Sequence, residues 1–481
     1  MKYIYFTILI CFSTYISSTA QKVGIDPSFQ PKGPFLGTID KMALQADGKI
    51  LIIGNFTKYD GIEVGGIARL HSNGQIDTSF KTGLGFFVKI NHIPNCIHIQ
   101  NDGKILIGGR FNSYNTTYAI NIVRLNQDGT ADTSFNATNV SGFNETKGTV
   151  YAIQTQSDGK IIASGDFDVS DKFESWNLIR FHPNGSLDKS FTLMGGVHGY
   201  TSVKLNCCSA NITDLAIQED GKIILVGNFH KHNLLNFRHI MRLNADGTVD
   251  SSFKTGLGTD NIIQSVFLQK DGKIIISGWF GTYNGIARSN MARLNQDGSL
   301  DSSFIAQVDN CSTFCTMVSK LLPDGRILNS SNNMILEPNG TADTILWRKT
   351  SFNYGAVSHV LDQADGKILV CGNFGNYEGQ TARGILRFEA SPVGVSQLNR
   401  EALKFNVFPN PMQDYADIVF ENPVQQGSLI VTNLLGETLL HIPHITGTSY
   451  RLERQAFPAG MYILNLATKH AKSSKKLIMV D

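Results

Sequence analysis

Short runs of β-branched and apolar residues alternate with glycine turns along residues 26–389, and the pattern recurs at a nearly constant period. An Asp-Gly-Lys tripeptide, or Asp-Gly-Arg in one copy, precedes each run. These turns begin at Asp47, Asp102, Asp158, Asp220, Asp271, Asp324 and Asp365. Asp-Gly tolerates the positive φ of a two-residue hairpin turn, and β-branched residues favour strands. Each run is therefore predicted to be a strand that follows a tight turn.

Three further elements complete each unit. Every apolar run except the sixth ends in a Gly-x-Phe element, with its glycine at Gly54, Gly109, Gly165, Gly227, Gly278 or Gly372. An Arg then precedes a second Asn-Gly or Asp-Gly turn, and an Asp-x-Ser-Phe element follows that turn. A unit of about 52 residues with four predicted strands has the period of a β-propeller blade. The repeated Asp, Arg and Lys residues are expected to serve turn geometry and local hydrogen bonding.

The ends of the repeat region predict how the fold closes. The last unit stops after Arg387-Phe388 and lacks its fourth strand, whereas the segment 26–29 is a fourth strand without a unit. We predict that this N-terminal strand completes the seventh blade, because closure removes an exposed sheet edge. The predicted fold is all-β: a seven-bladed β-propeller over residues 21–389, plus a small C-terminal β-sandwich. The sixth unit is an outlier that has lost its Arg and its middle loop.

The repeat resembles a known family. Residues 124–135 spell Arg-Leu-Asn-Gln-Asp-Gly-Thr-Ala-Asp-Thr-Ser-Phe, and a Gln-x-Asp-Gly-Lys-Ile element follows a hydrophobic strand in most units. This pattern resembles the delta-60 repeat of bacterial surface and secreted proteins. The resemblance covers residues 26–389 and implies a β-propeller, but it implies no defined reaction.

Composition narrows the classes of partner. The 42 Lys and Arg residues nearly balance the 40 Asp and Glu residues, which argues against a nucleic-acid-binding protein. No Gly-x-Ser-x-Gly elbow or phosphate-binding glycine loop precedes a predicted helix, and no segment carries a full calcium-ligand series. No cofactor or metal is therefore expected.

The first twenty residues predict a secretory leader. Lys2 precedes an apolar run over residues 3–16, and Ser18-Thr19-Ala20 supplies small residues for cleavage after Ala20. Outside the leader the chain has six cysteines, which are Cys96, Cys207, Cys208, Cys311, Cys315 and Cys371. In an exported protein they indicate one or two disulfides or free buried thiols rather than a metal site.

The C-terminal segment has alternating strands without the repeat motif. A linker is predicted over 390–404 and a separate domain over 405–481. Its ordered motifs resemble the sorting domain of type IX secretion, and they include Pro409, Asn410, Pro411, Gly436, Gly460, Tyr462, Lys475 and Lys476. The resemblance implies the type IX secretion machinery as a partner, export across a Gram-negative outer membrane and removal of the tail. The body is then released or attached to surface lipopolysaccharide.

Loop lengths predict where a ligand binds. The links between units vary widely in length, and the sixth unit has lost its loop between strands two and three; both kinds of loop lie on one face of a meander. Tyr59, Tyr114, Tyr283 and Tyr377 each follow a Gly-x-Phe element on that face, and Trp279 lies within one such element. Their rings are candidates to stack on sugars or peptides, with packing between loops as the alternative.

Other candidate groups are fewer. His230, His232 and His239 share one loop that could hold a metal or be a polar surface loop. Glu145 and Asp260, both between units, are the acids first considered for glycoside cleavage.

Three functions stay open from the sequence. The first is a secreted or surface binding module for an extracellular glycan, peptide or protein. The second is a carbohydrate-active enzyme on the same scaffold, which requires converging carboxylates or a His with shifted pKa values. The third is a structural protein of a surface layer.

Overall fold

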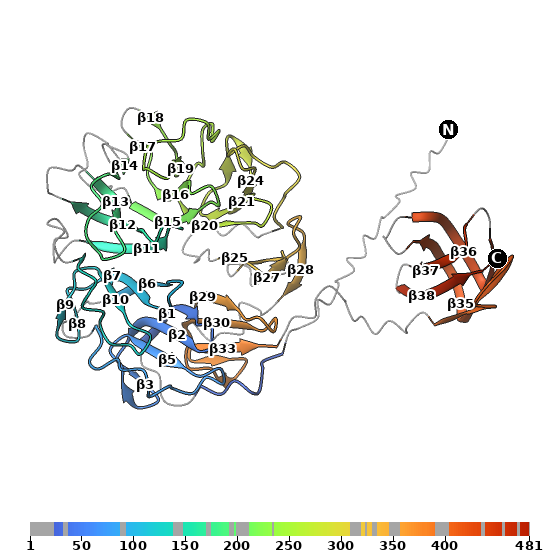
Figure 1. Cartoon of the computed structure of the whole chain (residues 1–481), viewed down its shortest axis with the longest axis horizontal. Helices are drawn as coiled ribbons and strands as arrows, with labels where there is room; N and C mark the ends of the chain where they lie inside the picture. Colours follow the sequence, from blue (N-terminus) through green and yellow to red (C-terminus); the bar gives the residue numbers. More distant parts are fainter. Residues whose placement is uncertain are drawn as a thin grey trace, which may run out of the picture. The chain divides into compact units, whose positions relative to one another are not determined.

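The computed structural model (Figure 1) divides the chain into two compact units, Met1–Val393 and Gly394–Asp481. It describes residues 24–31, 37–86, 93–137, 148–169, 175–191, 197–198, 211–232, 235–307, 319–322, 325–329, 334–345, 356–389, 404–433, 438–454, 457–468 and 472–480. The predicted leader with its cleavage site at Ala20 lies outside these residues, as do Glu145, Gly436, residues 390–403 and the cysteines Cys207, Cys208, Cys311 and Cys315. Across the described segments the secondary structure is strand and turn, so the predicted all-β class is confirmed. No helix there has the length and apolar character needed to cross a membrane.

The first unit is built from repeat sheets, each an antiparallel meander with the second strand in the middle. The sheets are β1 (Gly37–Leu44), β2 (Ile50–Phe56), β5 (Ile67–Leu70); β6 (Ile93–Ile99), β7 (Ile105–Arg110), β10 (Ile122–Leu125); β11 (Thr149–Thr155), β12 (Ile161–Val169), β13 (Ser175–Phe181); β15 (Asn211–Ile217), β16 (Ile223–Asn228), β19 (Ile240–Leu243); β20 (Ile263–Leu268), β21 (Ile274–Gly278), β24 (Met291–Leu294); β25 (Ser319–Leu321), β26 (Ile327–Asn329), β27 (Met334–Leu336), β28 (Ala342–Ile345); and β29 (Ala356–Asp362), β30 (Ile368–Asn373), β33 (Ile385–Phe388).

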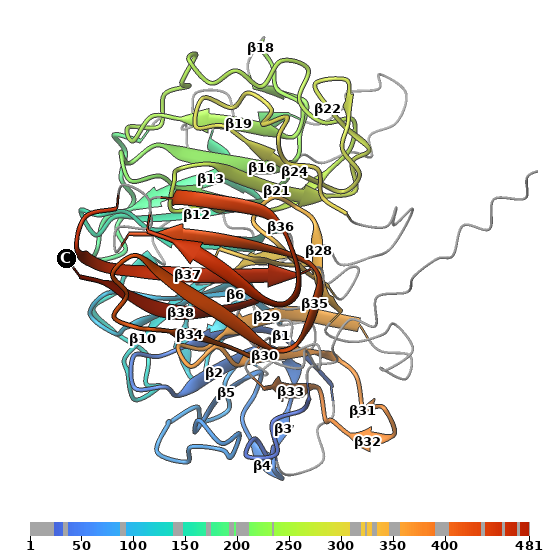
Figure 2. The same ribbon diagram turned by 90° about the vertical axis from the view of Figure 1, so that its right-hand side faces the viewer.

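Small hairpins occupy the loops between the second and third strands, at the periphery of the unit (Figure 2). They are β3 (Lys58–Tyr59) with β4 (Ile62–Glu63), β8 (Ser113–Tyr114) with β9 (Thr117–Tyr118), β17 (Lys231–His232) with β18 (Leu235–Asn236), β22 (Thr282–Tyr283) with β23 (Ile286–Ala287), and β31 (Asn376–Tyr377) with β32 (Gln380–Thr381). In the fourth repeat β14 (Val197–His198) adds to the hairpin.

The predicted fourth strand is shorter than expected in most repeats. In the first repeat it is a single bridge between Leu70 and Ile76. The backbone then turns at Asp77, whose carboxylate accepts hydrogen bonds from the Ser79 N–H at 3.0 Å and the Ser79 hydroxyl at 2.6 Å. The Asp-x-Ser-Phe element is therefore an Asx turn rather than strand. In the sixth repeat β28 is a true fourth strand.

The first strand of each sheet lies toward the centre of the unit, as Figure 1 shows for β1, β6, β11, β15, β20, β25 and β29. We call these the inner strands. Each contacts the inner strand of the next repeat, and β29 contacts β1.

Apolar side chains from the two faces of each sheet pack against different neighbours. Leu51 and Ile53 of β2 share a buried cluster with Ile105 of β7. On the other face, Ile50 shares a cluster with Leu369 of β30 in the last repeat. Because strand side chains alternate between faces, each sheet is covered on both sides by its neighbours. The core is thus a series of layers between successive sheets.

In every repeat except the sixth, an arginine joins the sheet to the next one. The Arg69 Nε donates to Asp77 at 2.8 Å, its Nη2 to Ser79 at 3.1 Å, and its Nη1 to the Gln127 carbonyl of the following repeat at 2.6 Å. Its guanidinium also lies 4.7 Å from the centre of the Phe80 ring, a favourable cation–π distance. The same bond to the next repeat is made from Arg124 to Pro183, Arg180 to Ala245, Arg242 to Gln296 and Arg293 to Pro338. The repeated charges therefore hold neighbouring repeats together.

Residues near the N-terminus supply this network for the last repeat. Arg387 donates to the Asp26 carboxylate at 2.7 Å and to the Ser28 hydroxyl at 3.0 Å, and it lies over the Phe29 ring. Its Nη1 also donates to the Ser72 carbonyl of the first repeat at 2.5 Å. The Asp26 N–H bonds to the Arg387 carbonyl at 2.8 Å, beside an antiparallel bridge between residues 25 and 388.

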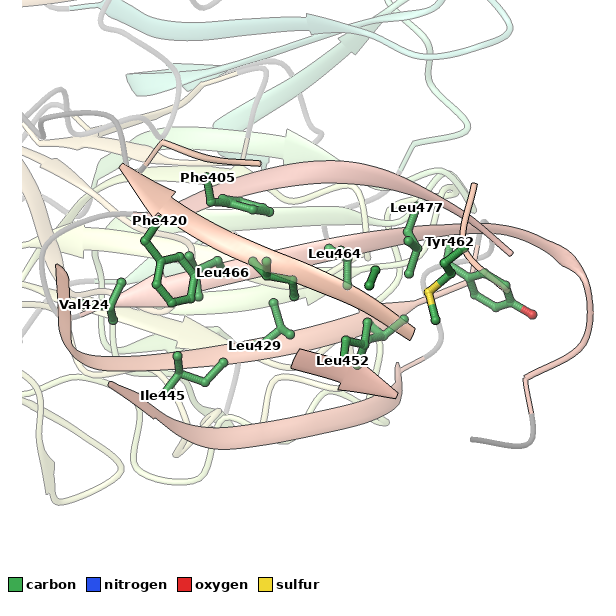
Figure 3. Packing of buried hydrophobic residues seen from close by; sticks show 14 of the residues in the cluster. Phe405, Phe420, Val424, Leu429, Ile445, Leu452, Tyr462, Leu464, Leu466 and Leu477 are labelled. Atoms are coloured by element: carbon green, nitrogen blue, oxygen red, sulfur yellow. The ribbon is translucent and has the colours of Figure 1, made fainter. Parts of the chain in front are cut away.

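The second unit is one five-stranded sheet of β34 (Phe405–Phe408), β35 (Tyr415–Thr432), β36 (Thr438–Glu453), β37 (Gly460–Thr468) and β38 (Lys472–Met479). The long β35 pairs with β34 near its start, with β37 near its end, and with β36 on its other edge. Met412 pairs with Met479, so the segment after β34 meets β38 and the sheet nearly closes on itself. The predicted sandwich is therefore wrong, because a continuous curved sheet encloses the core that Figure 3 shows around Leu429 and Leu464.

Candidate functional site

A β-bulge interrupts most inner strands at the same place. In β1 the register with β2 shifts between Ile39 and Lys41, which leaves Asp40 unpaired opposite Gly54. Equivalent shifts occur in β6, β11, β15, β20 and β29. Each shift lies opposite the glycine of a Gly-x-Phe element, so this element marks the bulge.

Close approach of the bulged strand explains why glycine is required. A Cβ atom placed on Gly227 would lie 2.2 Å from the Asn211 carbonyl oxygen and 3.0 Å from the Thr213 nitrogen. Both of these atoms are backbone, so neither can move aside as a side-chain end could. A β-bulge re-aims the side chains around it. The glycine therefore permits a bulge that sets the direction of residues 213 and 214.

We expect Gly227→Ala to destabilise the first unit by about 1–3 kcal/mol, the range for overpacking a close contact. Gly375→Ala is the matched control, because no atom lies within 4 Å of a Cβ at that position. Urea unfolding of both variants measures the difference. Equal stability of the two variants would contradict the role assigned to the glycine.

The bulges place two partly exposed or small residues per repeat on the inner strands, and we call these residues the bulge layer. They are Asp40 and Lys41, Asn95 and Cys96, Tyr151 and Ala152, Thr213 and Asp214, Gln264 and Ser265, and Ser358 and His359. All except Cys96 and Ala152 keep some exposed surface. The scaffold residues repeat, whereas both positions of this layer differ in every described copy. Different side chains at equivalent positions of a repeated backbone can together form a site for one particular ligand.

Four members of the layer contact the next inner strand, among them Thr213, whose hydroxyl donates to the Ile263 carbonyl at 2.7 Å, and Cys96, whose thiol lies 3.9 Å from the Val150 carbonyl. The Asp214 carboxylate accepts hydrogen bonds from the Leu215 N–H at 2.9 Å and from the Val266 N–H at 3.0 Å. In the last repeat, His359 Nδ1 accepts from the Met42 N–H at 3.3 Å. An Nδ1 that accepts leaves the imidazole proton on Nε2. These bonds fix the orientation of the Asp214 and His359 side chains.

Burial and one cation set the electrostatics of the layer. Burial raises the pKa of Asp214 and of Asp40, although the Lys41 charge acts in the opposite direction on both carboxyls. Burial also holds the pKa of His359 well below its usual value, and Lys41 lowers it further. The imidazole is therefore neutral near pH 7. Lys41 lies on the inner strand β1, and its charge acts on groups of inner strands as distant in sequence as β15 and β29.

The four tyrosines do not offer their rings to a ligand. Tyr59, Tyr114, Tyr283 and Tyr377 are buried, with exposed fractions of 0–2%. The first three hydroxyls donate to the carbonyls of turn glycines, at 2.9 Å to Gly74 and 2.7 Å to Gly129 and Gly298. The stacking hypothesis is wrong for these residues, because the small hairpins fold back and pack the rings inside the repeats.

The remaining candidates are not members of the bulge layer. Trp279 is 37% exposed directly after β21, and its backbone N–H donates to the Ile262 carbonyl at 2.9 Å, close in sequence to Gln264 of the layer. Asp260 accepts hydrogen bonds from the Gly281 and Thr282 N–H groups at 2.8 and 3.0 Å, so it holds a peripheral hairpin. The structure does not bring Asp260 to the inner strands.

The histidine pair has a local packing role. His239 Nδ1 lies 3.0 Å from the Gly227 carbonyl, the bond that Asn177 and Asn290 make to glycines in other repeats. Its ring contacts His230 edge-on, with ring centres 4.5 Å apart, and burial lowers its pKa to about 4. The side chain of His232 lies outside the description. Among described residues, no group of three or more His, Cys, Asp or Glu could hold a metal ion.

Two cysteines fall in the described segments. Cys96 and Cys371 are free buried thiols. Burial raises the pKa of both thiols, so neither is activated as a nucleophile.

The sorting motif residues cluster at the seam of the second unit. Asn410, between the exposed Pro409 and Pro411, donates to the Lys476 carbonyl at 2.8 Å and accepts from the Ile478 N–H at 2.8 Å. The Lys475 ammonium lies 3.0 Å from the Asn406 side-chain oxygen, and Gly460 begins β37. The Tyr462 hydroxyl donates to the Pro458 carbonyl at 2.7 Å. These motifs thus close the curved sheet.

Comparisons with known families agree with both parts of the chain. Six segments match a domain of unknown function (DUF5122) described as a β-propeller, at residues 45–80, 100–135, 156–191, 218–253, 269–304 and 363–391. Residues 406–480 match the secretion system C-terminal sorting domain. No curated protein matches the chain.

Solved structures give only distant likenesses. A gluconolactonase from Xanthomonas campestris is 13% identical and covers 75% of this chain and 99% of its own, with a TM-score of 0.35. A protein of unknown function from Bacteroides caccae is 14% identical, and the match covers 55% of this chain and 79% of that protein, with a TM-score of 0.28. The extracellular domain of a one-component system from B. thetaiotaomicron is 11% identical, and the match covers 92% of this chain and 69% of that domain, with a TM-score of 0.26. Scores this low carry no argument about function.

The family matches and the sheets together define the class of protein. The chain carries repeats that match this β-propeller family, followed by a segment that matches the type IX secretion sorting domain. It is a secreted or cell-surface protein that the type IX secretion machinery handles. The predicted resemblances to propeller repeats and to the sorting domain are confirmed.

The bulge layer was absent from the residues predicted as a site. The signal for it was present in the sequence, as the fifth and fourth residues before the Gln of each Gln-x-Asp-Gly-Lys element differ among repeats. Without the bulge, alternation would send these two residues to opposite faces of the strand.

Proposed function

We propose that the first unit is a seven-bladed propeller closed by its N-terminal strand, and that it is a secreted or surface binding module whose ligand contacts the bulge layer. The network of Asp26 and Arg387 and the contact of β29 with β1 support closure. The observation that carries the binding site is the contrast between a repeated scaffold and a bulge layer that differs in each copy.

The proposed ligand is an extracellular glycan, peptide or protein segment that reaches the inner strands. After removal of the tail, the body is released or attached to surface lipopolysaccharide at the outer membrane. Trp279, partly exposed at the end of β21, is a proposed additional contact. The structural surface-layer role has no particular observation in its favour.

A carbohydrate-active enzyme is the second candidate. Two carboxyls with raised pKa, Asp40 and Asp214, share the bulge layer with the neutral His359. Groups with shifted pKa values near one another are the usual equipment for acid–base catalysis. Turnover of a bound ligand would favour this candidate over a pure binding module.

A glycan and peptide array on the secreted protein, with turnover assayed for each hit, tests the proposal. We expect Asn95→Ala, Gln264→Ala and Ser358→Ala, combined, to weaken binding of each hit at least tenfold. The matched control combines Thr116→Ala, Gln380→Ala and Thr381→Ala, which change exposed side chains of the small hairpins and should leave binding unchanged. The reverse outcome would place the site on the variable loops instead of the bulge layer.

A further inference from the structure

Lys41 differs from the other lysines near the inner strands. Lys104 and Lys273 pair with aspartates at 2.7 and 2.8 Å, and Lys367 pairs with Asp26 at 2.8 Å. Among the described residues, no hydrogen bond or ion pair is found for the Lys41 ammonium. The Lys41 charge interacts with the Asp40 and Asp214 carboxyls without a direct bond to either, so its ammonium keeps its hydrogen-bond donors available to an anion.

The neighbours of Lys41 present complementary hydrogen-bonding groups. Asp214 uses each carboxylate oxygen for one backbone N–H, and each oxygen keeps a lone pair to accept from a hydroxyl. His359 presents an Nε2–H donor, because its Nδ1 is occupied by the Met42 N–H. The layer thus offers one positive charge, one oriented acceptor and one neutral donor.

The charges also limit which anion fits. Lys41 is the single cation of the bulge layer, and the layer contains no Arg, the residue suited to bidentate binding of phosphate. Asp40 and Asp214 would repel a dianion more strongly than a monoanion. A singly charged carboxylate on a molecule rich in hydroxyls matches the site better than a phosphate does.

We propose that the bulge layer binds an acidic sugar of the hexuronate class, with the sugar carboxylate paired to Lys41 and its hydroxyls bonded to Asp214 and His359. This inference rests on the proposed binding function. It makes Lys41 the residue that distinguishes acidic from neutral sugars.

Calorimetric titration of the purified secreted protein with D-galacturonate, D-glucuronate, D-galactose and inorganic phosphate tests the assignment. We expect at least one uronate to bind at least tenfold more tightly than D-galactose. Lys41→Met should abolish this preference, and Lys41→Arg should retain most of it. Lys81→Met is the control, since Lys81 pairs on the surface with Asp128 at 3.3 Å and should not affect binding.

The outcomes separate the inference from the function on which it rests. Uronate binding that Lys41→Met leaves unchanged, or phosphate binding tighter than that of either uronate, would overturn the assignment of Lys41. Ligands found on the array that respond to the bulge-layer variant but not to Lys41→Met would leave the binding module standing and reject the acidic sugar. Thermal unfolding of both Lys41 variants checks that each is folded. If Lys41→Met does not fold, the comparison of Lys41→Arg with the unchanged protein still tests the assignment.

Discussion

Asp26→Ala is expected to lower the free energy of unfolding of the whole first unit by about 3–5 kcal/mol, the cost of breaking a buried ion pair from one side. Asp26 and Arg387 are 2% and 6% exposed, and the substitution leaves the arginine without its carboxylate. It also removes the partner of Lys367 at 2.8 Å. Urea unfolding at pH 7 measures the loss.

Two reference variants sharpen this prediction. Asp132→Ala removes the equivalent carboxylate in the second repeat and should cost a similar amount. Asp365→Ala removes an exposed carboxylate 3.9 Å from the same Lys367 and should cost less than about 1 kcal/mol. If Asp26→Ala behaved like Asp365→Ala, or if deletion of residues 21–30 left the melting temperature unchanged, the N-terminal strand would not close the fold.

Acid is expected to unfold the first unit cooperatively below about pH 4, the unfolded-state pKa of aspartate. Burial alone would raise the pKa of Asp77, but hydrogen bonds from Ser79 and Lys49 and the charge of Arg69 hold it well below its ordinary value. The same balance applies to Asp26, Asp132, Asp188, Asp250 and Asp301.

The sign of the pH dependence follows from these directions. A depressed folded-state pKa stabilises the fold above the unfolded pKa, and the stabilisation is lost as the pH falls through the folded pKa. Each proton taken up on unfolding contributes a slope of about 1.4 kcal/mol per pH unit. Asp40 and Asp214, with raised pKa values, act in the opposite sense and at higher pH, so they do not obscure the loss below pH 4.

Urea midpoints between pH 2 and pH 7 measure this slope. Asp77→Asn should reduce stability at pH 7 and lower the acid slope by roughly one proton. An unchanged slope in that variant would mean that Asp77 does not contribute to acid unfolding. Melting temperatures that stay constant down to pH 2 would contradict the prediction for the whole set.

The sequence predicted the repeat, the strands and the sorting tail because each depends on local chemistry. Asp-Gly turns and β-branched runs specify hairpins within a few residues. The pairing of segment 26–29 with the last repeat was predicted because that repeat lacks a fourth strand and the segment is a fourth strand without a unit. The tail sheet was mispredicted because alternation in β35 does not reveal that its two ends pair with different strands.

The candidate site was harder to predict because it depends on contacts between strands. Tyr114 was predicted to lie on the face of the loops between strands two and three, yet its hydroxyl reaches the carbonyl of Gly129 inside the repeat. The bulge opposite Gly227 changes which face Asp214 occupies, and a side-chain pattern of period two cannot show that change.

The bond between Asp26 and Arg387 has a consequence for biogenesis. The two residues are 361 positions apart, so this contact closes a loop that spans nearly the whole repeat region. Such non-local pairing is slow, since the entropy of loop closure is lost before the contact is gained. A chain emerging from its N-terminal end cannot complete the proposed ring until its last repeat is available. The last step of folding therefore waits until the whole repeat region is present.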